Sequence, residues 1–268
     1  AVGLCVPGIV EPREGGGGAR VTRSLNVPGL EGVGLRDLLR VCVGVPSDYP
    51  MTLASDAHAA AVDFAASRAA AGNALSGRLL ALSLGTGVGA CVLDGGRALE
   101  VSGGGPGHVG AMDVSGGDEV PPRAADGSVG TLEAYMGLPA LRSRLGAGEA
   151  VGRVGGEGGG QTAQRAEDER AALESLEPGA MPLLALVRAV RIAHAVYRPQ
   201  HVALLGGVGL ALAGRASALR AAVSEGLTTL ARKGWTLEAG TTDLHAARGA
   251  ATLAARALGD LASGARYS

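Results

Sequence analysis

The strongest constraint on the fold is a pair of apolar runs on either side of a glycine cluster, LLALSLGTGVGACVLDGG at residues 79–96. Each run is typical of a buried strand, and the glycines between them let the chain reverse, so the stretch predicts a β-hairpin. Elsewhere, apolar runs alternate with helical patterns, such as the Ala-rich segment after Ser55-Asp56 and a closing segment at 244–261. This alternation predicts an α/β architecture.

Composition limits how the core can be filled. The chain has 268 residues, enough for one large domain or two of ordinary size. Hydrophobic residues make up 47% and aromatic residues only 2%, so Leu, Val and Ala must form most of the core. Cys5, Cys42 and Cys91 lie in apolar, strand-like contexts without metal-ligand spacing. We interpret them as buried free thiols in a reducing cytoplasm.

Charge and hydropathy argue against two classes of protein. The net charge is −1, from 24 basic and 25 acidic residues, and no basic stripe runs along the chain. Nucleic-acid binding by this segment is therefore not expected. The sequence contains no run of 18 apolar residues, so we expect no membrane span. It also shows no signal peptide, and we expect a cytoplasmic protein.

The glycine cluster GTGVG at 85–89 admits two interpretations. It is not a P-loop, because no Lys-Ser/Thr follows it, and it lacks the glycine spacing of a dinucleotide-binding turn. Glycines nevertheless let a backbone approach an anion closely and turn N–H groups toward it, and Thr86 adds a hydroxyl. Taken alone, the cluster fits a plain hairpin turn or a phosphate-binding loop.

Three further features carry the same ambiguity. Asp56 follows an apolar strand and opens a helix, so it fits either an N-cap or a general base that takes a proton from a hydroxyl. Gly206-Gly207-Val208-Gly209 fits a tight strand-to-helix turn or a flat surface under a purine. His108, in a Gly-rich loop, and Glu133, in the first turn of a helix, fit structural roles or hydrogen bonds to vicinal hydroxyls.

Together these features resemble the ROK family (repressor, open reading frame, kinase), which includes bacterial glucokinases and other hexose kinases. The resemblance covers nearly the whole chain. It is carried, in chain order, by the buried strand VGLCVPGIV, by SLNVPGL, by SDAHAAA at 55–61, by GTGVG and by LLGGVG.

This resemblance implies an actin-like (ribonuclease H-like) two-domain sugar kinase fold, with the sugar between the domains and ATP and Mg²⁺ on the second domain's side. Asp56 falls on the catalytic aspartate of the family. Sugar contacts are implied for Asn26, Ser55, His108 and Glu133, and phosphate or nucleotide contacts for Gly85, Thr86, Gly87, Gly89, Gly206 and Gly207.

Several positions depart from the family pattern. Pro106–Ala111 aligns with Ala-Gly-Glu-Ile-Gly-His, so His108 replaces a sugar-binding Glu and Ala111 replaces a His that contacts the sugar and zinc. Residues 124–133, AADGSVGTLE, align with the family's Cys-rich zinc motif but contain no cysteine. We therefore expect no metal ligands and no structural zinc here. Ser55 replaces the usual Asn, which changes an amide into a single hydroxyl.

The family's first phosphate loop, Asp-x-Gly-Gly-Thr, occurs nowhere in the chain. Either the loop lies upstream of Ala1, which leaves the N-terminal domain incomplete in this chain, or the protein is a degenerate relative of the family, in which case catalysis is not expected. Residues 1–76 are then the remainder of a sugar-binding subdomain, on which a closing helix at 246–268 packs. Residues 77–245 are predicted to form the C-terminal nucleotide-binding domain.

The sequence therefore predicts ATP-dependent phosphorylation of a hexose or hexose derivative at the C6 hydroxyl, with Asp56 as the general base. The alternative is a catalytically inactive ROK-type sugar sensor or transcriptional regulator. The expected partners are a small-molecule sugar and a nucleotide, with no membrane and no nucleic acid bound by this segment. The resemblance also suggests a homodimer. ATP and polyphosphate both remain open as the phosphoryl donor.

Overall fold

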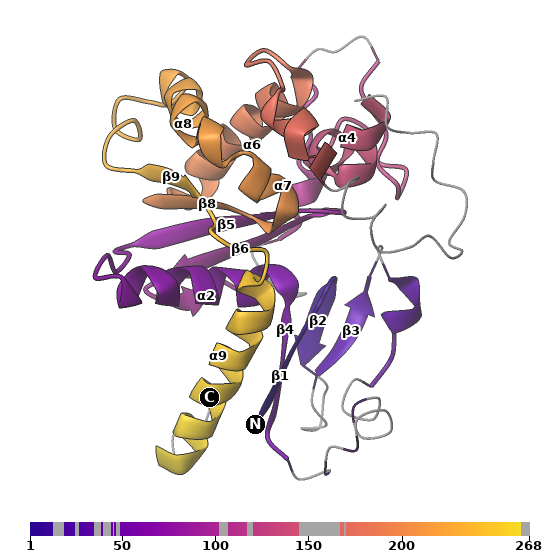
Figure 1. Ribbon diagram of the computed structural model, residues 1–268, viewed down its shortest axis with the longest axis vertical. Helices are drawn as coiled ribbons and strands as arrows, with labels where there is room; N and C mark the ends of the chain where they lie inside the picture. Colours follow the sequence, from indigo (N-terminus) through magenta and orange to yellow (C-terminus); the bar gives the residue numbers. More distant parts are fainter. Residues whose placement is uncertain are drawn as a thin grey trace. The chain divides into compact units, whose positions relative to one another are not determined.

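The computed structural model describes residues 1–12, 19–24, 27–34, 39, 44, 46, 49–101, 107–116, 120–144, 167–168 and 170–263. Strands alternate with helices along this chain, which confirms the predicted α/β class (Figure 1). The chain divides into two compact units. The first unit comprises Ala1–Ala81, Ala90–Gly107 and Leu244–Ser268, and the second comprises Leu82–Gly89 and His108–Asp243.

The first unit begins with a parallel strand pair. Strand β1 (Val2–Val6) lies beside β4 (Met51–Ser55), with Val6 opposite Ser55. A turn at Pro7-Gly8 follows β1, as the sequence predicts, and Gly8 takes a positive φ of 133° that favours glycine. Strands β2 (Ile9–Pro12) and β3 (Ala19–Arg23) then form an antiparallel pair, and η1 (Pro28–Leu30) follows.

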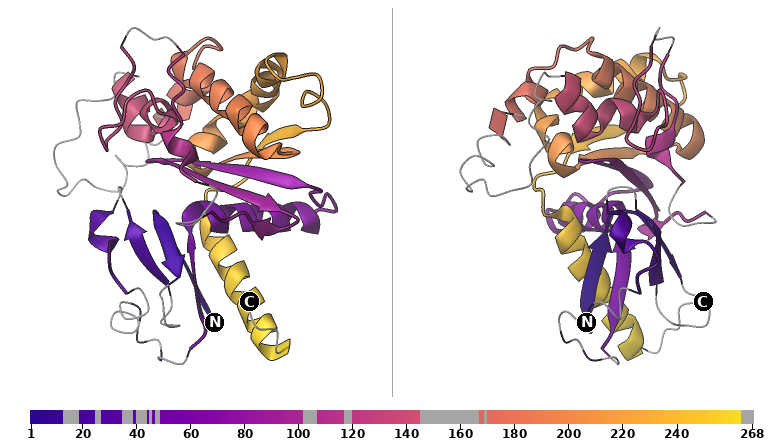
Figure 2. Two further views of the ribbon diagram at one scale, coloured as in Figure 1. Left: turned by 180° about the vertical axis from the view of Figure 1, so that it is seen from behind. Right: turned by 90° about the vertical axis from the view of Figure 1, so that its right-hand side faces the viewer.

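Two helices complete the first unit, α2 (Asp56–Ala70) and α9 (His245–Ser263), and they meet near the start of α9 (Figure 2). Small residues permit this contact. A Cβ added at Gly249 would overlap the carbonyl oxygen of Ala59 on α2, and one at Gly3 would overlap that of Ala250 on α9. The main chains therefore meet directly, and no side chain stands between them at these points.

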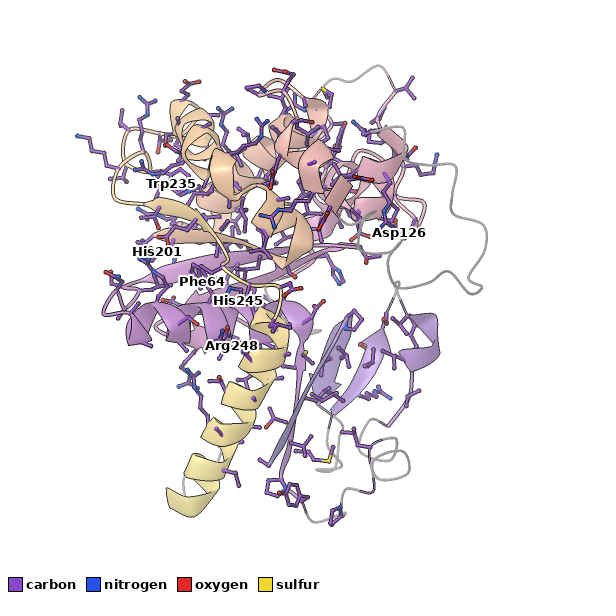
Figure 3. The ribbon with its side chains drawn as sticks, viewed as in Figure 1. Phe64, Asp126, His201, Trp235, His245 and Arg248 are labelled. Atoms are coloured by element: carbon purple, nitrogen blue, oxygen red, sulfur yellow. The ribbon has the colours of Figure 1, made fainter. Side chains whose placement is uncertain are left out.

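A buried hydrogen bond links the same two helices. Asp63 on α2 and His245 on α9 are each under 5% exposed, and Asp63 Oδ2 lies 2.7 Å from Nδ1 of His245, which is labelled in Figure 3 beside Phe64 and Arg248. Arg248 approaches from the solvent side, with its Nε 3.5 Å from Asp63 Oδ1. The ring of Phe64 packs edge-on against that of His245, with centroids 6.0 Å apart. The histidine is thus fixed by both a hydrogen bond and a ring contact.

The five-stranded sheet has the strand order β7-β6-β5-β8-β9, and the boundary between the units passes through β5 and β6. Its members are β5 (Arg78–Leu84), β6 (Val88–Asp94), β7 (Arg97–Ala98), β8 (His201–Leu205) and β9 (Thr236–Ala239). Strands β5 and β6 are neighbours joined by GTGVG, which confirms the predicted hairpin. Strands β8 and β9 run parallel to each other.

The helices of the second unit are short apart from α6. They are η2 (Val109–Ala111), α3 (Leu132–Met136), α4 (Leu138–Arg144), α6 (Met181–Tyr197), α7 (Gly206–Ala211), η4 (Ala213–Arg215) and α8 (Ala216–Glu225). Arg188 on α6 donates hydrogen bonds from Nη1 to the carbonyl oxygens of Val114 and Ser115, at 2.8 and 3.1 Å. This contact fixes the loop after η2 to the long helix.

Two of the three cysteines lie within the described residues, and both are free thiols. Cys91 is buried, and burial raises the pKa of its thiol to about 12, whereas Cys5 is half-buried. Cys42 lies outside the described residues. Among the described helices, none combines the length and the apolar character needed to cross a membrane.

The buried pair predicts a specific loss of stability. In His245→Ala the Asp63 carboxylate stays buried without its nearest partner, and we expect the free energy of unfolding to fall by about 3–5 kcal/mol. Arg248→Ala is the matched control, because its side chain is 59% exposed and the same carboxylate is 3.5 Å away. That variant should lose about 1 kcal/mol or less. Urea unfolding measures both, and equal losses would contradict the role assigned to His245.

Candidate functional site

In the first unit the candidate site is centred on Asp56, the first residue of α2. The residue follows β4 directly, at the carboxyl end of the parallel pair, where α/β folds place their ligands. Ser55 is the N-cap of this helix, and its Oγ accepts a hydrogen bond from the His58 N–H at 3.2 Å. The capping role considered for Asp56 thus belongs to Ser55.

The environment of Asp56 suits a base. Burial raises the pKa of its carboxyl above the usual 3.8, and hydrogen bonds from the backbone of Ala57 and of Asp56 itself act in the opposite direction. The bond from Ala57 N–H to Oδ1 is 2.7 Å long and fixes the carboxylate plane. A fixed carboxylate whose charge is poorly solvated takes up a proton more readily than a free aspartate does.

In the second unit the candidate site is the GTGVG loop. Gly85 N–H donates to the Gly87 carbonyl at 3.0 Å, and the Gly85 carbonyl accepts from Leu138 N–H at 2.8 Å. These bonds hold the turn closed from its own side and from the start of α4. Thr86 at the tip is exposed, and Val88, which opens β6, is buried. The loop therefore presents its tip outward on a fixed base.

Glu133 provides the main side-chain anchor of this loop. Its Oε2 accepts a hydrogen bond from the backbone N–H of Val88 at 2.9 Å. Gly110 makes room for this contact, because a Cβ there would stand 2.6 Å from the Val88 carbonyl oxygen. A Cβ at Gly137 would likewise stand 2.8 Å from the carbonyl oxygen of Glu133. The sequence predicted Glu133 as a sugar contact. It did not predict that Glu133 holds the loop, or that Gly110 and Gly137 pack closely against neighbouring carbonyl groups.

The second glycine stretch lies next to the first. Gly206 follows β8 with a φ of +76°, and a Cβ there would stand 2.5 Å from the carbonyl oxygen of Leu84, the last residue of β5. Because Gly85 follows Leu84 directly, the GTGVG loop and the Gly206-Gly207 turn meet at one edge of the sheet. Gly207 is exposed, and a Cβ there would meet nothing within 4 Å. The sequence placed both stretches on the nucleotide side, and the fold makes them neighbours.

The remaining predicted positions are less constrained. His108 precedes η2 with an exposed side chain that makes no capping hydrogen bond, and Ala111 is exposed at the end of η2. Asn26 lies outside the described residues. Asp56 and Ser55 belong to the first unit, whereas His108 and Glu133 belong to the second.

Hydrogen bonds organise the segment that aligns with the family's zinc motif. Asp126 Oδ1 accepts from Ser128 N at 2.9 Å and from Ser128 Oγ at 2.6 Å, and Ser128 Oγ lies 3.3 Å from Thr131 Oγ1. Arg123 Nη1 donates to the Gly127 carbonyl at 2.6 Å. In the part of the chain that the structure describes, no three His, Cys, Asp or Glu side chains are grouped to hold a metal ion.

Comparison with known proteins gives a family and a fold. The sequence model of the ROK family matches residues 1–257. No curated protein matches the sequence. Among solved structures, the chain is similar to a Streptomyces griseus ROK family glucokinase in complex with glucose and AMPPNP, at 20% identity and a TM-score of 0.67. The match covers 96% of this chain and 81% of that one.

Two further structures extend the comparison. A ROK hexokinase from Thermus thermophilus is 25% identical with a TM-score of 0.62, over 97% of this chain and 80% of that one. A ROK family transcriptional regulator, a homologue of the E. coli MLC protein, is 20% identical with a TM-score of 0.65. The match covers 95% of this chain but spans only 61% of the regulator's length. These likenesses confirm the predicted mixed α/β fold of the actin-like ATPase kind.

The two adjacent glycines after β8 provide a matched pair of substitutions. Gly206→Ala places a methyl group against the Leu84 carbonyl in a left-handed backbone conformation, and we expect a loss of about 1–3 kcal/mol in unfolding free energy. Gly207→Ala meets open space and should change stability by about 0.5 kcal/mol or less. Thermal unfolding tests both variants, and equal effects would argue against the close contact.

The anchor of the loop is testable by amide hydrogen exchange. Glu133→Ala removes the acceptor of the Val88 N–H, and we expect faster exchange at this amide and about 1–3 kcal/mol less stability. Glu133→Gln keeps a side-chain carbonyl that can accept the same bond, so its Val88 amide should remain protected. Exchange at Val88 that is unchanged in Glu133→Ala would show that the carboxylate does not anchor the loop.

Proposed function

The chain belongs to the ROK family, and on that premise we propose that it is an ATP-dependent sugar kinase that phosphorylates a hexose or hexose derivative. The observation that carries this proposal is the meeting of the GTGVG loop and the Gly206-Gly207 turn at Leu84. A loop rich in backbone N–H groups beside an open, flat glycine surface suits a nucleoside with a phosphate tail.

The residues on the nucleotide side have distinct roles in this proposal. The exposed tip of the loop, with Thr86, would cradle phosphate oxygens, and the unobstructed Gly207 would leave room for the nucleoside. Glu133 would keep the loop in its binding conformation through Val88. The Streptomyces griseus relative was solved with the ATP analogue AMPPNP, which supports a nucleotide as the donor.

Magnesium fits this arrangement without a dedicated protein cage. Mg²⁺ keeps several waters and takes substrate phosphates as ligands, so one or two carboxylates suffice. The described residues contain no group of three His, Cys, Asp or Glu side chains that could hold a metal ion. An ATP site does not require such a group. When bound, Mg²⁺ neutralises charge on the phosphates.

On the sugar side Asp56 would act as the general base. Its half-buried carboxylate would accept the proton of the attacking hydroxyl, which we assign to C6, as the oxygen approaches the γ-phosphate. The Ser55 oxygen already accepts from His58 N–H, so its hydroxyl proton remains to donate to a sugar oxygen. Asn26, His108 and the second carboxylate oxygen of Glu133 would contact further hydroxyls.

A second candidate function is a sugar-responsive regulator without catalysis. Its support is the match to the ROK transcriptional regulator, which covers 95% of this chain. The altered sugar positions, Ser55, His108 and Ala111, also suit a protein selected for binding rather than turnover. Sugar binding without ATP-dependent product would favour this candidate.

The decisive experiment uses the protein expressed from its complete coding sequence, with ATP and a panel of hexoses and amino sugars. Asp56→Asn should lower kcat by about 10²–10⁴-fold, because the amide cannot accept the hydroxyl proton. Asp94→Asn is the control, since it removes an exposed carboxylate of the same unit. Turnover that is absent with every sugar, or unaffected by Asp56→Asn, would overturn the kinase proposal.

The raised pKa of Asp56 also predicts a stability effect. A carboxyl whose pKa is raised by folding makes its full contribution to stability at a pH below the pKa of the unfolded chain, near 3.8. This contribution is lost as the pH rises through the folded-state pKa. Asp56→Asn removes the titrating group. The unfolding free energy of the variant minus that of the wild type should therefore rise over that pH interval and stay at the raised value at neutral pH. Urea unfolding between about pH 3.5 and 7 measures the difference, and parallel pH profiles would contradict the assignment.

A further inference from the structure

Two hydrogen bonds attach the GTGVG loop to α3 and to the start of α4. Leu138 N–H donates to the Gly85 carbonyl at 2.8 Å, and Val88 N–H donates to Glu133 Oε2 at 2.9 Å. The first bond joins main chain to main chain. The second depends on a glutamate side chain, which has considerable rotamer freedom when nothing else holds it. The position of Val88 therefore depends on how well Glu133 is ordered.

The Glu133 carboxylate has one oxygen to spare. Within the described part of the chain, Oε1 makes no hydrogen bond. The side chain is half-buried, and Oε1 is not one of the buried polar atoms that lack a partner there, so it is open to solvent. A carboxylate accepts several hydrogen bonds on its two oxygens. A hydroxyl can therefore donate to Oε1 while Val88 continues to donate to Oε2.

The η2 segment packs against the same point. A Cβ at Gly110 would stand 2.6 Å from the Val88 carbonyl oxygen and 3.5 Å from Glu133 Oε2. Gly110 belongs to η2, which directly follows His108. The main chain of η2, the Glu133 carboxylate and Val88 thus meet within the second unit. One carboxylate there contacts the phosphate loop and faces the segment that follows a predicted sugar contact.

On the proposed function, in which Glu133 also contacts a sugar hydroxyl, we propose that this carboxylate couples the binding of the two substrates. A hydroxyl that donates to Oε1 fixes the side chain, so the Val88 N–H meets an acceptor that is already in place. The nucleotide then binds a loop that has less conformational entropy left to lose. Coupling is reciprocal, so bound nucleotide raises the affinity for the sugar by the same factor. Toward the nucleotide, Glu133 is a positioning residue that acts through Val88.

The coupling is measured by isothermal titration calorimetry on the protein expressed from its complete coding sequence. AMPPNP with Mg²⁺ is titrated with and without a saturating concentration of D-glucose, D-mannose or D-glucosamine. For the sugar that binds most tightly, we expect the nucleotide Kd to fall by about fivefold or more. In Glu133→Ala, saturated with the same sugar, the Kd should change by less than about twofold, because both acceptor oxygens are gone.

Amide hydrogen exchange tests the step at Val88 directly. Saturating sugar alone, without nucleotide, should slow exchange at the Val88 amide by about threefold or more, because the acceptor of its hydrogen bond is held in place. The matched control is the Ser128 amide, which donates to Asp126 Oδ1 at the same distance of 2.9 Å in the same unit. Its exchange should not respond to the sugar.

Two variants separate coupling from a general loss of structure. Glu133→Gln keeps a side-chain carbonyl for the Val88 N–H, so it should restore most of the nucleotide affinity that Glu133→Ala loses. Glu177→Ala removes an exposed carboxylate of the same unit and should leave the coupling unchanged.

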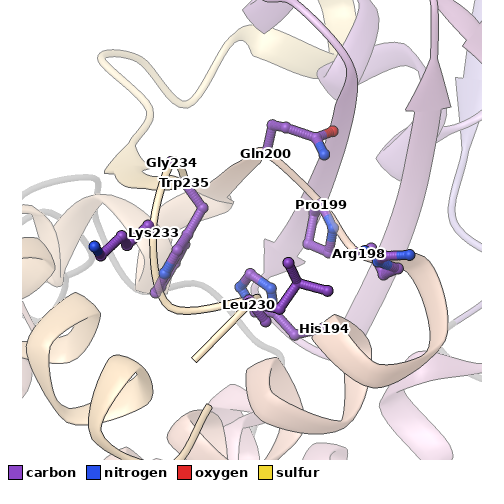
Figure 4. A pocket seen from close by; sticks show the side chains of 9 residues that line it. His194, Arg198, Pro199, Gln200, Leu230, Lys233, Gly234 and Trp235 are labelled. Atoms are coloured by element: carbon purple, nitrogen blue, oxygen red, sulfur yellow. The ribbon is translucent and has the colours of Figure 1, made fainter. Parts of the chain in front are cut away.

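Trp235 provides the check that Glu133→Ala is folded. It is the only tryptophan in the chain, and it is 2% exposed. Its ring meets that of His194 edge to face, with centroids 4.6 Å apart, and the two side chains line a cavity at the end of α6 (Figure 4). An unchanged fluorescence emission maximum would show that this part of the second unit keeps its packing in the variant.

Two results would overturn the coupling and leave the kinase proposal standing, since turnover and its dependence on Asp56 are measured separately. The first is a nucleotide Kd that the sugar does not lower in the wild type, or lowers equally in Glu133→Ala. The second is exchange at the Val88 amide that the sugar leaves unchanged. Failure of AMPPNP or of all three sugars to bind the wild type would overturn both proposals.

Discussion

Main chain packs directly on main chain at the positions that define this fold. Gly206 lies against the carbonyl of Leu84, Gly249 against that of Ala59, and Gly110 against that of Val88. A chain with 2% aromatic residues has few large side chains to fill gaps between elements, so close approach of the backbones keeps its interior dense. Each of these glycines also positions one specific feature: the turn after β8, the contact between α2 and α9, or the base of the GTGVG loop.

The candidate site follows from this packing. The loop can be composed of glycine because its shape is imposed from beneath, by Glu133 on Val88 and by Leu138 on Gly85. A free glycine-rich turn would lose considerable conformational entropy on binding a phosphate, whereas a loop that is already held loses less. At the other candidate centre, Ser55 caps α2, so Asp56 is not needed as the cap.

Local patterns predicted the parts of the fold that local physics determines. The hairpin at 79–96, the turn at Pro7-Gly8 and the α/β class follow from apolar runs and glycine positions that neighbouring residues decide. The N-cap of α2 was less predictable, because Ser and Asp are both favoured at this position. The helix begins at Asp56, so the preceding residue, Ser55, is the cap. The link from Glu133 to Val88 spans 45 residues and the link from Asp63 to His245 spans 182, so neither leaves a local signal. The roles of the predicted site residues in sugar and nucleotide binding remain predictions.

The bond between Asp63 and His245 joins residues 182 positions apart, and everything in the second unit lies between them in sequence. During synthesis at about 5–20 residues per second, α2 leaves the ribosome long before α9 exists. Until α9 has been synthesised, Asp63 and the small residues of α2 lack their contacts with that helix. The second unit, interrupted only once in sequence, can become compact first. Completion of the first unit is therefore a late event in the life of the nascent chain, and the interval before it is when this protein is most exposed to chaperones and proteases.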